Sequence, residues 1–310
     1  IGYAVGSDGI ILKTTNGGQI WVLRNSAPNY TLYSIHFTDS NTGYAVGSSG
    51  NIFKTTDAGI TWTKLSSGVN GLLRSIDFLG SDKGFVVGDN GIILKTTDGG
   101  ATWTDQVSGT TSNLYGVHFE NINDTYIVGE HIILKTSDGG STWVVQNVLP
   151  ATPILHSVFF PSGDIGYACG GNGVILKTTD EGANWVKLES PTAQLLQSMF
   201  FIDKNTGFGV GYSGTILKTL NGGVGIKEIL QTTKPLKLSP NPTTGIVRIE
   251  PSNISKNSRL WIMDVSGHIM LEQKVTEKEV ILDVSALPAG LYFAYISDGR
   301  QRELARFVRQ

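Results

Sequence analysis

Short apolar runs separated by polar turns recur along most of the chain at a fixed interval. The runs LYSIHF, LRSIDF, LYGVHF, LHSVFF and LQSMFF begin at Leu32, Leu73, Leu114, Leu155 and Leu196, each 41 residues after the last. Each repeat continues with a run such as GYAVG, then ILKT, then an Asp/Asn-Gly turn and a tryptophan. Because each run is short and bounded by Gly, Asn, Asp or Ser, the pattern predicts four antiparallel strands per repeat.

A period of this length with four strands per repeat predicts an all-β fold, a β-propeller over residues 1–226. We expect three strands in the first of six visible repeats, four in each of the next four, and three or four in the last. Six or seven blades therefore remain possible. Since the sequence opens inside a repeat, we expect an upstream segment that includes a signal peptide.

The segment GIILKTTDGGATW, Gly91–Trp103, contains a lysine, a carboxylate, hydroxyls and paired glycines, which could suggest a phosphate cradle or a catalytic loop. Its recurrence in every repeat favours a fold module instead, in which Asp-Gly-Gly forms the turn, threonines bond to it and the tryptophan is an apolar anchor. The repeated lysines are expected to pack their stems and extend their heads into solvent over a tryptophan. The predicted structural residues are Asp57, Asp98, Asp138, Asp180, Trp21, Trp62, Trp103, Trp143 and Trp185.

Composition narrows the function classes. The net charge is −2, and residues 1–230 hold 13 basic against 18 acidic groups, so nucleic acid is not an expected partner. The single cysteine, Cys169, replaces Val46 and Val87 of other repeats and is expected to be a buried thiol. No apolar run is long enough for a transmembrane segment. Gly209–Gly214 matches G-x-G-x-x-G but precedes a strand, so we predict no dinucleotide site, no cofactor and no metal.

Positions that differ between repeats are the candidates for a site, because a ring of identical units has no unique binding place. The turns between second and third strands read SDG, SSG, DNG, EH, GNG and YSG. They nominate as ligand-binding residues Asp89, Asn90, Glu130, His131 and Tyr212. At one position of the innermost strand, His36, Asp77 and His118 are expected to hydrogen-bond between blades, in preference to binding a metal.

The period stops after residue 226, and a different alternation begins. Residues 227–238 are predicted to be a linker. The runs IVRIE, RLWIMDV, IMLEQKV, VILDV, LYFAYI and ARFVRQ predict six or seven strands, which make a small Ig-like β-sandwich over residues 239–310.

Two resemblances follow from these motifs. The segment Thr96-x-Asp98-x-Gly100-x-Thr102-Trp103 resembles the Asp-box of sialidase-type repeats, and the whole unit over residues 1–226 is similar to photosystem II assembly-factor-like propellers. Sialidases imply an arginine triad, yet residues 1–230 contain only Arg24 and Arg74, so sialidase activity is not expected. Assembly factors imply an arginine-rich basic patch, which this acidic propeller lacks.

The C-terminal segments LSPNPTTG, WIMDVSGHIM, DVSALPAGLYFAYI and ARFVRQ resemble the sorting domain of the type IX secretion system. The residues that match its motif are Pro240, Asn241, Pro242, Gly245, Asp264, Gly267, Gly290 and Tyr292. The resemblance implies export through the periplasm and across the outer membrane by the type IX machinery, cleavage near the linker, and release or attachment at the cell surface. The alternative is a carbohydrate-binding or spacer sandwich.

We therefore expect a secreted or surface-displayed propeller that binds a glycan or a protein without catalysis. An alternative is an extracellular polysaccharide hydrolase with its two carboxylates among the variable turns. A third possibility is a structural or adhesive segment of a larger exoprotein.

Overall fold

The computed structural model describes residues 1–24, 30–146, 153–223, 227–228, 234–252, 254–256, 258–264, 269–297 and 302–310. The chain divides into two compact units, Ile1–Ile229 and Leu230–Gln310. Across these described ranges, no helix is long and apolar enough to cross a membrane.

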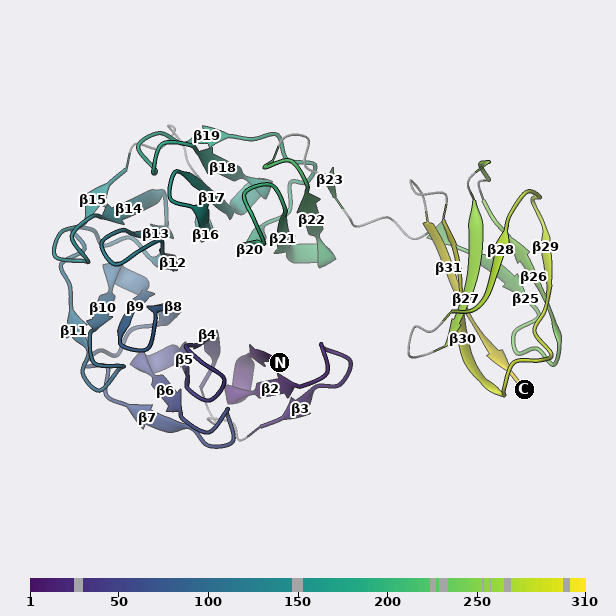
Figure 1. The fold of residues 1–310 in the computed structure, drawn as a ribbon, viewed down its shortest axis with the longest axis horizontal. Helices are drawn as coiled ribbons and strands as arrows, with labels where there is room; N and C mark the ends of the chain where they lie inside the picture. Colours follow the sequence, from purple (N-terminus) through teal and green to yellow (C-terminus); the bar gives the residue numbers. More distant parts are fainter. Residues whose placement is uncertain are drawn as a thin grey trace. The chain divides into compact units, whose positions relative to one another are not determined.

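The first unit is a β-propeller of antiparallel sheets, which we call blades, arranged around a central axis (Figure 1). The first blade has three strands, β1 (Gly2–Val5), β2 (Ile11–Thr14) and β3 (Val22–Leu23). The second comprises β4 (Leu32–Phe37), β5 (Gly43–Gly47), β6 (Ile52–Thr55) and β7 (Thr63–Leu65). The third comprises β8 (Leu73–Leu79), β9 (Lys83–Gly88), β10 (Ile93–Thr96) and β11 (Thr104–Asp105).

The remaining three blades repeat the four-stranded order. They comprise β12 (Leu114–Phe119), β13 (Thr125–Gly129), β14 (Ile132–Thr136) and β15 (Val144–Val145); β16 (Leu155–Ser162), β17 (Ile165–Gly170), β18 (Ile175–Thr178) and β19 (Val186–Lys187); and β20 (Leu196–Phe201), β21 (Gly207–Gly211), β22 (Ile216–Thr219) and β23 (Lys227–Glu228). The predicted strand count of three, then four per repeat, is confirmed, and the last blade has four. The first and last blades flank a break in the ring of blades (Figure 1).

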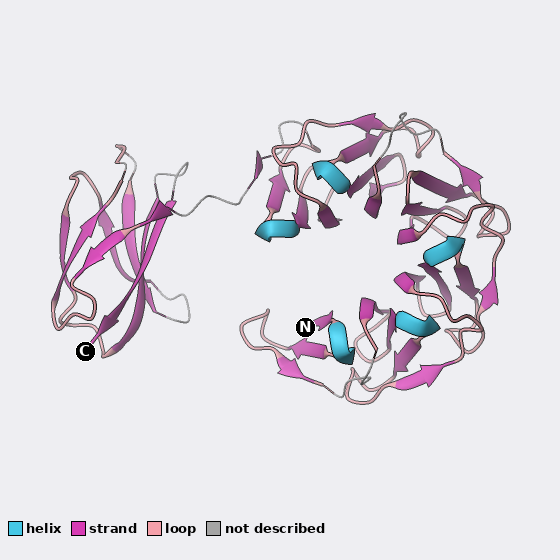
Figure 2. Cartoon of the chain, turned by 180° about the vertical axis from the view of Figure 1, so that it is seen from behind, coloured by secondary structure: helices cyan, strands magenta, loops and turns pink. Residues whose placement is uncertain are grey.

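Most blades join the second and third strands of the repeat, which are β1 and β2 in the three-stranded first blade, through a one-turn 3-10 helix, drawn in cyan in Figure 2. These turns are η1 (Ser7–Gly9), η2 (Ser48–Gly50), η3 (Asp89–Gly91), η4 (Gly171–Gly173) and η5 (Tyr212–Gly214). Their middle residues adopt a left-handed backbone, as in Asn90 at φ 58°. The fourth repeat is one residue shorter, and His131 takes this conformation alone, also at φ 58°. The variation among these turns therefore occurs on a fixed backbone shape.

Aromatic side chains join each blade to the next. Tyr44 of the second blade stacks on Phe78 of the third, with ring centroids 4.2 Å apart, and Phe78 meets Trp103 edge-on. Gly84 makes room for this ring, because a Cβ at that position would lie 2.7 Å from Phe78. The tryptophans are thus anchors within the blade interfaces, as predicted from the repeat.

Paired donors from one blade also bind a backbone carbonyl in the turn of the next. Tyr44 Oη and Lys54 Nζ each donate to the Gly99 carbonyl at 2.7 Å, and the Lys54 ammonium lies 5.3 Å from the Tyr44 ring centroid. The same arrangement joins Tyr3 and Lys13 to Ala58, Tyr126 and Lys135 to Glu181, and Tyr167 and Lys177 to Gly222. The expectation that these lysine heads reach solvent over tryptophan is therefore wrong. A carbonyl of the next repeat draws each ammonium inward, over a tyrosine.

Trp21 departs from the buried pattern. It is 43% exposed, whereas Trp185 is 3% exposed. In the described first blade no innermost strand supplies a phenylalanine, so Gly2 faces Thr14 and Trp21 themselves. Trp21 is therefore exposed because the described residues of this blade form three strands and provide no phenylalanine to cover it.

The second unit is a sandwich of two sheets. One has the order β24 (Lys234–Pro235), β31 (Arg302–Arg309), β30 (Gly290–Ser297), β27 (Arg259–Asp264) and β28 (Ile269–Lys274), and the other has the order β25 (Lys237–Ser239), β26 (Ile246–Glu250) and β29 (Val280–Asp283). Val247, Ile262, Ala294 and Phe307 are fully buried between the sheets. The six C-terminal strands predicted from alternation are confirmed.

The predicted linker, residues 227–238, also contributes strands. Lys227 and Glu228 pair with β22 as the outermost strand of the last blade. Lys234 and Pro235 pair in parallel with β31, and β25 begins at Lys237. Backbone pairing at both ends therefore shortens the segment between the two units relative to the prediction.

Candidate functional site

The Asp-box carboxylates are occupied by their own turns. Asp98 Oδ1 accepts from the Thr96 hydroxyl at 2.8 Å and from the Thr102 amide at 2.9 Å, and Oδ2 accepts from the Thr102 hydroxyl at 2.6 Å. These bonds, led by the Thr102 hydroxyl, lower the pKa of Asp98 to about 2. Asp57 and Asp138 accept from the equivalent threonines of their own turns and also have a pKa of about 2. Asn184 takes the place of the second threonine for Asp180. The local bonding that the sequence predicted is present, and it leaves these groups as turn-forming acceptors.

Asp89, one of the candidate turn residues, is bound by the arginine of its own innermost strand. Arg74 Nε donates to Asp89 Oδ1 at 2.8 Å and Arg74 Nη2 donates to Asp89 Oδ2 at 3.0 Å. The pair is partly buried, and the bond to Asp89 raises the pKa of Arg74 above its ordinary value. This bidentate geometry orients the guanidinium and stabilises an ionised carboxylate.

Glu130 is held in an equivalent place one blade further on. Its Oε1 accepts from the Tyr115 hydroxyl and from Asn113 Nδ2, both at 3.0 Å. The Tyr115 hydroxyl is the main reason that the pKa of Glu130 lies below its usual value. Asn113 also accepts from the Asn90 backbone amide at 2.9 Å, so the turns of two adjacent blades are joined.

These contacts assemble a continuous series of side chains across four innermost strands, which we call the aromatic–cation row: Tyr33, Arg74, Tyr115 and His156. The Arg74 guanidinium carbon lies 5.0 Å from the Tyr33 ring centroid and 5.5 Å from that of Tyr115. The rings of Tyr115 and His156 are 4.8 Å apart. Tyr33 is 41% exposed. The row therefore presents aromatic faces around a cation that Asp89 fixes in place.

The row was not predicted from the sequence. Its members occupy the second position of the runs LYSIHF, LRSIDF, LYGVHF and LHSVFF, and Gln197 follows in LQSMFF. That position changes chemistry between repeats while its neighbours stay apolar or small. The same variability argument that nominated the turns would have found it.

Some of the five predicted ligand-binding residues contact the row, and others lie elsewhere. Asp89 and Glu130 bind row members, and Asn90 adjoins them through Asn113. His131 follows Glu130 in the turn. Tyr212 lies on η5 of the last blade and is 61% exposed. A shared site for all five stays a prediction.

A second polar group joins the same strands further along. His36 Nδ1 lies 3.1 Å from Asp77 Oδ1, His118 Nδ1 lies 3.7 Å from Asp77 Oδ2, and the Phe119 amide donates to Asp77 Oδ2 at 2.8 Å. Burial lowers the pKa of His118. Asp77 thus bridges three consecutive blades, which confirms the predicted hydrogen bonding between blades. Within the described ranges no three metal-binding side chains gather around one point.

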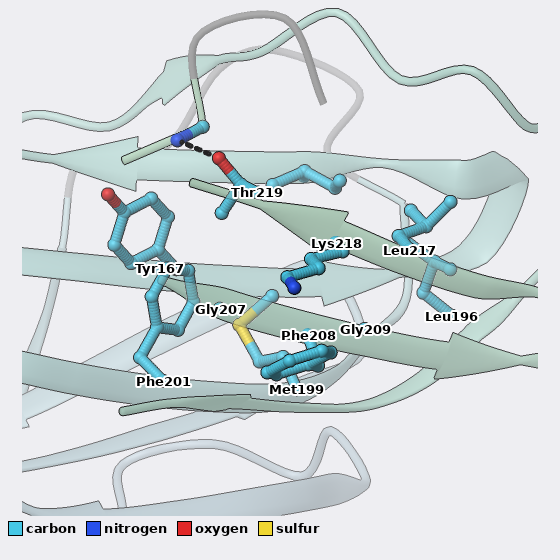
Figure 3. A pocket seen from close by; sticks show the side chains of 12 residues that line it. Tyr167, Leu196, Met199, Phe201, Gly207, Phe208, Gly209, Leu217, Lys218 and Thr219 are labelled. Atoms are coloured by element: carbon cyan, nitrogen blue, oxygen red, sulfur yellow. Dashed lines mark hydrogen bonds between the residues drawn. The ribbon is translucent and has the colours of Figure 1, made fainter. Parts of the chain in front are cut away.

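The structure also has a small apolar cavity of about 30 Å³ between the last two blades (Figure 3). It borders Met199, Gly209 and Leu217, and Lys218 extends over the ring of Phe208 at 5.5 Å. Val86 and Ile127 occupy the position of Gly209 in other repeats. The cavity therefore reflects a missing side chain, and it has room for about one water molecule.

Cys169 is fully buried, and burial raises the pKa of its thiol. The prediction of a buried thiol is confirmed. Gly209–Gly214 runs from β21 through η5, and β22 begins at Ile216, so a strand follows this segment as expected.

The residues that match the sorting-domain motif lie in turns and at strand ends. Asn241 Nδ2 donates to the Arg306 carbonyl and its Oδ1 accepts from the Val308 amide, both at 3.0 Å. The Tyr292 hydroxyl donates to the Pro288 carbonyl at 2.9 Å, and the side chain is 4% exposed. Pro240 and Pro242 flank Asn241, the Gly245 carbonyl accepts from Val284, Gly290 begins β30 and Asp264 ends β27. Gly267 lies outside the described residues.

Comparison with known families matches both units. The model described as photosynthesis system II assembly factor YCF48 matches residues 1–66, 25–109 and 105–192. The model described as secretion system C-terminal sorting domain matches residues 237–310. No curated protein matches the chain significantly.

Solved structures show the same architecture. YCF48 bound to D1 peptide is 21% identical, with a TM-score of 0.62, over 80% of this chain and 84% of that chain. PorZ, a surface component of the type IX secretion system of Porphyromonas gingivalis, is 14% identical, with a TM-score of 0.55, over 99% of this chain and 50% of that chain. The GH74 enzyme of Niastella koreensis is 16% identical, with a TM-score of 0.56, over 90% of this chain and 45% of that chain.

At these identities the structural likeness shows the fold alone, and this chain spans about half the length of PorZ and of the GH74 enzyme. The family models show more, because the repeat model covers well over half of the chain and the sorting model covers its end. The sorting domain indicates secretion to the cell surface or beyond. The chain belongs to the family of the photosynthesis system II assembly factor YCF48 repeats and carries a secretion system C-terminal sorting domain.

Proposed function

We propose that this secreted propeller is a non-catalytic binding module whose ligand, a glycan or a protein, contacts the aromatic–cation row. The observation that carries the proposal is the Arg74 guanidinium held between the rings of Tyr33 and Tyr115. This arrangement occurs at a position where the repeats differ, so it gives the propeller one surface site that the other blades do not repeat. Aromatic faces beside fixed polar groups are suited to sugar rings and to peptide side chains alike.

The state of the carboxylates supports binding over hydrolysis. A glycosidase requires one carboxyl group that stays protonated as a general acid, and its pKa is therefore raised. The pKa of Glu130 is shifted in the opposite direction, and Asp89 is bound bidentately by Arg74. Both groups serve to position row members. A related fold is solved with a bound peptide and another is a glycoside hydrolase, so both ligand classes enter the test.

The test incubates the whole chain with soluble and insoluble polysaccharides and measures retention and released reducing ends in the same tubes. Photo-crosslinking to intact cells of a bacterium with a type IX secretion system provides the protein arm. We expect Tyr33→Ala to weaken the retained interaction about tenfold, because losing one aromatic contact costs about 1.4 kcal/mol. Gln197→Ala is the matched control, since Gln197 is exposed at the same position of β20 and lies beyond the row.

Reducing ends that disappear in Asp89→Asn or Glu130→Gln would refute the non-catalytic function. Equal retention and equal crosslinking by Tyr33→Ala and the parent chain would refute the placement of the ligand on the row.

A further inference from the structure

The sorting domain has apolar side chains on both faces of its larger sheet. Leu260 and Ile262 of β27 point into the core and are buried, while Trp261 and Met263 lie on the opposite face and are half-buried. The residues of β30 alternate in the same way: Tyr292, Ala294 and Ile296 are buried in the core, and the residues between them lie on the opposite face. A solvated outer face of an antiparallel sheet is normally polar.

Strand register places the outer residues side by side. Trp261, Tyr295 and Leu304 pair across β27, β30 and β31, with the rings of Trp261 and Tyr295 5.4 Å apart. Met263, Phe293 and Arg306 form the next line, and Leu291 and Val308 the third. Leu291 is 39%, Leu304 37% and Val308 39% exposed. We call these eight residues the outer aromatic face.

The outer face of the smaller sheet has a different character. Arg248 on β26 pairs with Glu279 at 3.1 Å, and most of the other exposed positions on its strands are polar: Lys237, Ser239, Glu250 and Asp283. Ile246 and Ile281 are the exceptions, at 57% and 59% exposed. Continuous lines of apolar groups across three paired strands thus occur on the outer face of β27, β30 and β31, and clustered exposed apolar groups mark interaction surfaces.

The charges on the outer aromatic face restrict its occupant. Arg259 at the margin is already paired with Glu272. Arg306 lies within the apolar lines, and among the described residues no acidic side chain forms an ion pair with it. Two copies packed face to face would bury each Arg306 against apolar groups or against another arginine, which is costly for an unpaired charge. A partner with an apolar surface and one carboxylate satisfies both features.

We propose that the outer aromatic face is the surface by which a protein of the type IX secretion machinery recognises this sorting domain, with a carboxylate of that protein opposite Arg306. The inference rests on the secretion role that the sorting-domain match indicates and is independent of the propeller ligand. It assigns a recognition role to residues outside the motif of Pro240, Asn241 and Tyr292, which the structure shows to be turn and core elements.

The experiment expresses the full chain behind a periplasmic export signal in a bacterium with a type IX secretion system. The fraction reaching the medium or the cell surface is compared with the fraction retained in the periplasm. We expect Phe293→Thr and Arg306→Glu each to lower the exported fraction at least about tenfold, the scale of losing one central contact. Arg306→Lys should keep most of the export, because it keeps the charge. Ile281→Thr, on the smaller sheet, should export as the parent chain does.

Purified variants provide the check on folding. Thermal melting of Arg306→Glu should match the parent chain, since Arg306 is exposed, so this variant still tests the surface if Phe293→Thr unfolds. Polysaccharide retention and cell crosslinking by the propeller should be unchanged in both variants, which separates this inference from the proposed function.

Normal export of Arg306→Glu and of a folded Phe293→Thr would overturn the proposal. An equal export defect in Ile281→Thr would also overturn it, because the face would then have no special role. A dimer of the parent chain in sedimentation that Phe293→Thr dissociates would assign the face to a second copy, and binding to anionic lipid vesicles that Arg306→Glu abolishes would assign it to a membrane.

Discussion

The paired donors between blades offer a quantitative test of what holds this propeller together. Tyr44 Oη and Lys54 Nζ share one acceptor, the Gly99 carbonyl, at 2.7 Å each. Replacing either donor alone leaves that carbonyl bonded to the other. We therefore expect Tyr44→Phe and Lys54→Met each to lower the free energy of unfolding by about 1 kcal/mol, the net value of one hydrogen bond.

The double variant should lose more than the sum of the two changes. It removes both bonds and leaves the Gly99 carbonyl without a donor inside the blade interface, which adds about 1–3 kcal/mol of desolvation cost. The expected total is about 3–5 kcal/mol, with a coupling energy of about 1–3 kcal/mol. The repeat itself supplies a precedent for the milder change, because Phe85 and Phe208 stand where other blades have tyrosine.

The assay is denaturant unfolding followed by tryptophan fluorescence. Five of the six tryptophans lie in the propeller and Trp261 lies in the sorting domain, so a Trp261→Phe background isolates the propeller signal. Strictly additive effects would refute the shared-acceptor reasoning. A negligible effect of Lys54→Met alone would show that its ammonium bond is compensated by lost hydration.

Three further outcomes follow from the packing. Gly209→Ala should stabilise the chain by about 1 kcal/mol in thermal or chemical unfolding, because its added Cβ meets no atom closer than 3.8 Å and the residue has no positive φ; a loss of stability would contradict this. Gly84→Ala should cost about 2 kcal/mol in the same assay, since its Cβ would lie 2.7 Å from the Phe78 ring; a neutral result would show that this ring moves freely. Thr102→Val should move acid unfolding to higher pH, measured by circular dichroism. The pKa of Asp98 is about 2 against an ordinary 3.8, so the stability that its ionised form provides is complete above about pH 4 and is lost as the pH falls toward 2. Losing the Thr102 hydroxyl raises this pKa and so reduces that stability at low pH. An unchanged pH midpoint of acid unfolding would refute the role of this bond.

The fold could be predicted because its information is local and repeated. Alternation within each run, the Asp-Gly-Gly turn and the 41-residue spacing all lie within short stretches of sequence. The function of the repeated lysines could not be predicted in the same way. Lys54 binds a backbone carbonyl 45 residues away, and a carbonyl has no sequence signature.

The candidate site was found in part for the same reason. Asp89 and Glu130 stood out as irregular turn residues, but their partners Arg74 and Tyr115 are on the innermost strands, and the contact of Arg74 with Tyr33 and Tyr115 depends on adjacent blades being placed side by side. The outer aromatic face was missed because RLWIMDV reads as an ordinary strand. Which of its two apolar sets becomes the core is decided only by the opposing sheet.

The two kinds of position in the repeat explain how one frame can support both stability and a single site. Tyr44, Phe78 and Trp103 have counterparts in most blades because each blade interface needs the same stacked rings. The second position of the innermost strand lies outside these stacked rings, and Gln197 occupies it in the last blade. The residue type there can therefore change between repeats without altering the ring stack, so arginine and aromatic residues could be gathered on neighbouring strands. The same reasoning supports the proposed placement of the ligand at the row, and it assigns the repeated turns of Asp57, Asp98, Asp138 and Asp180 to the architecture.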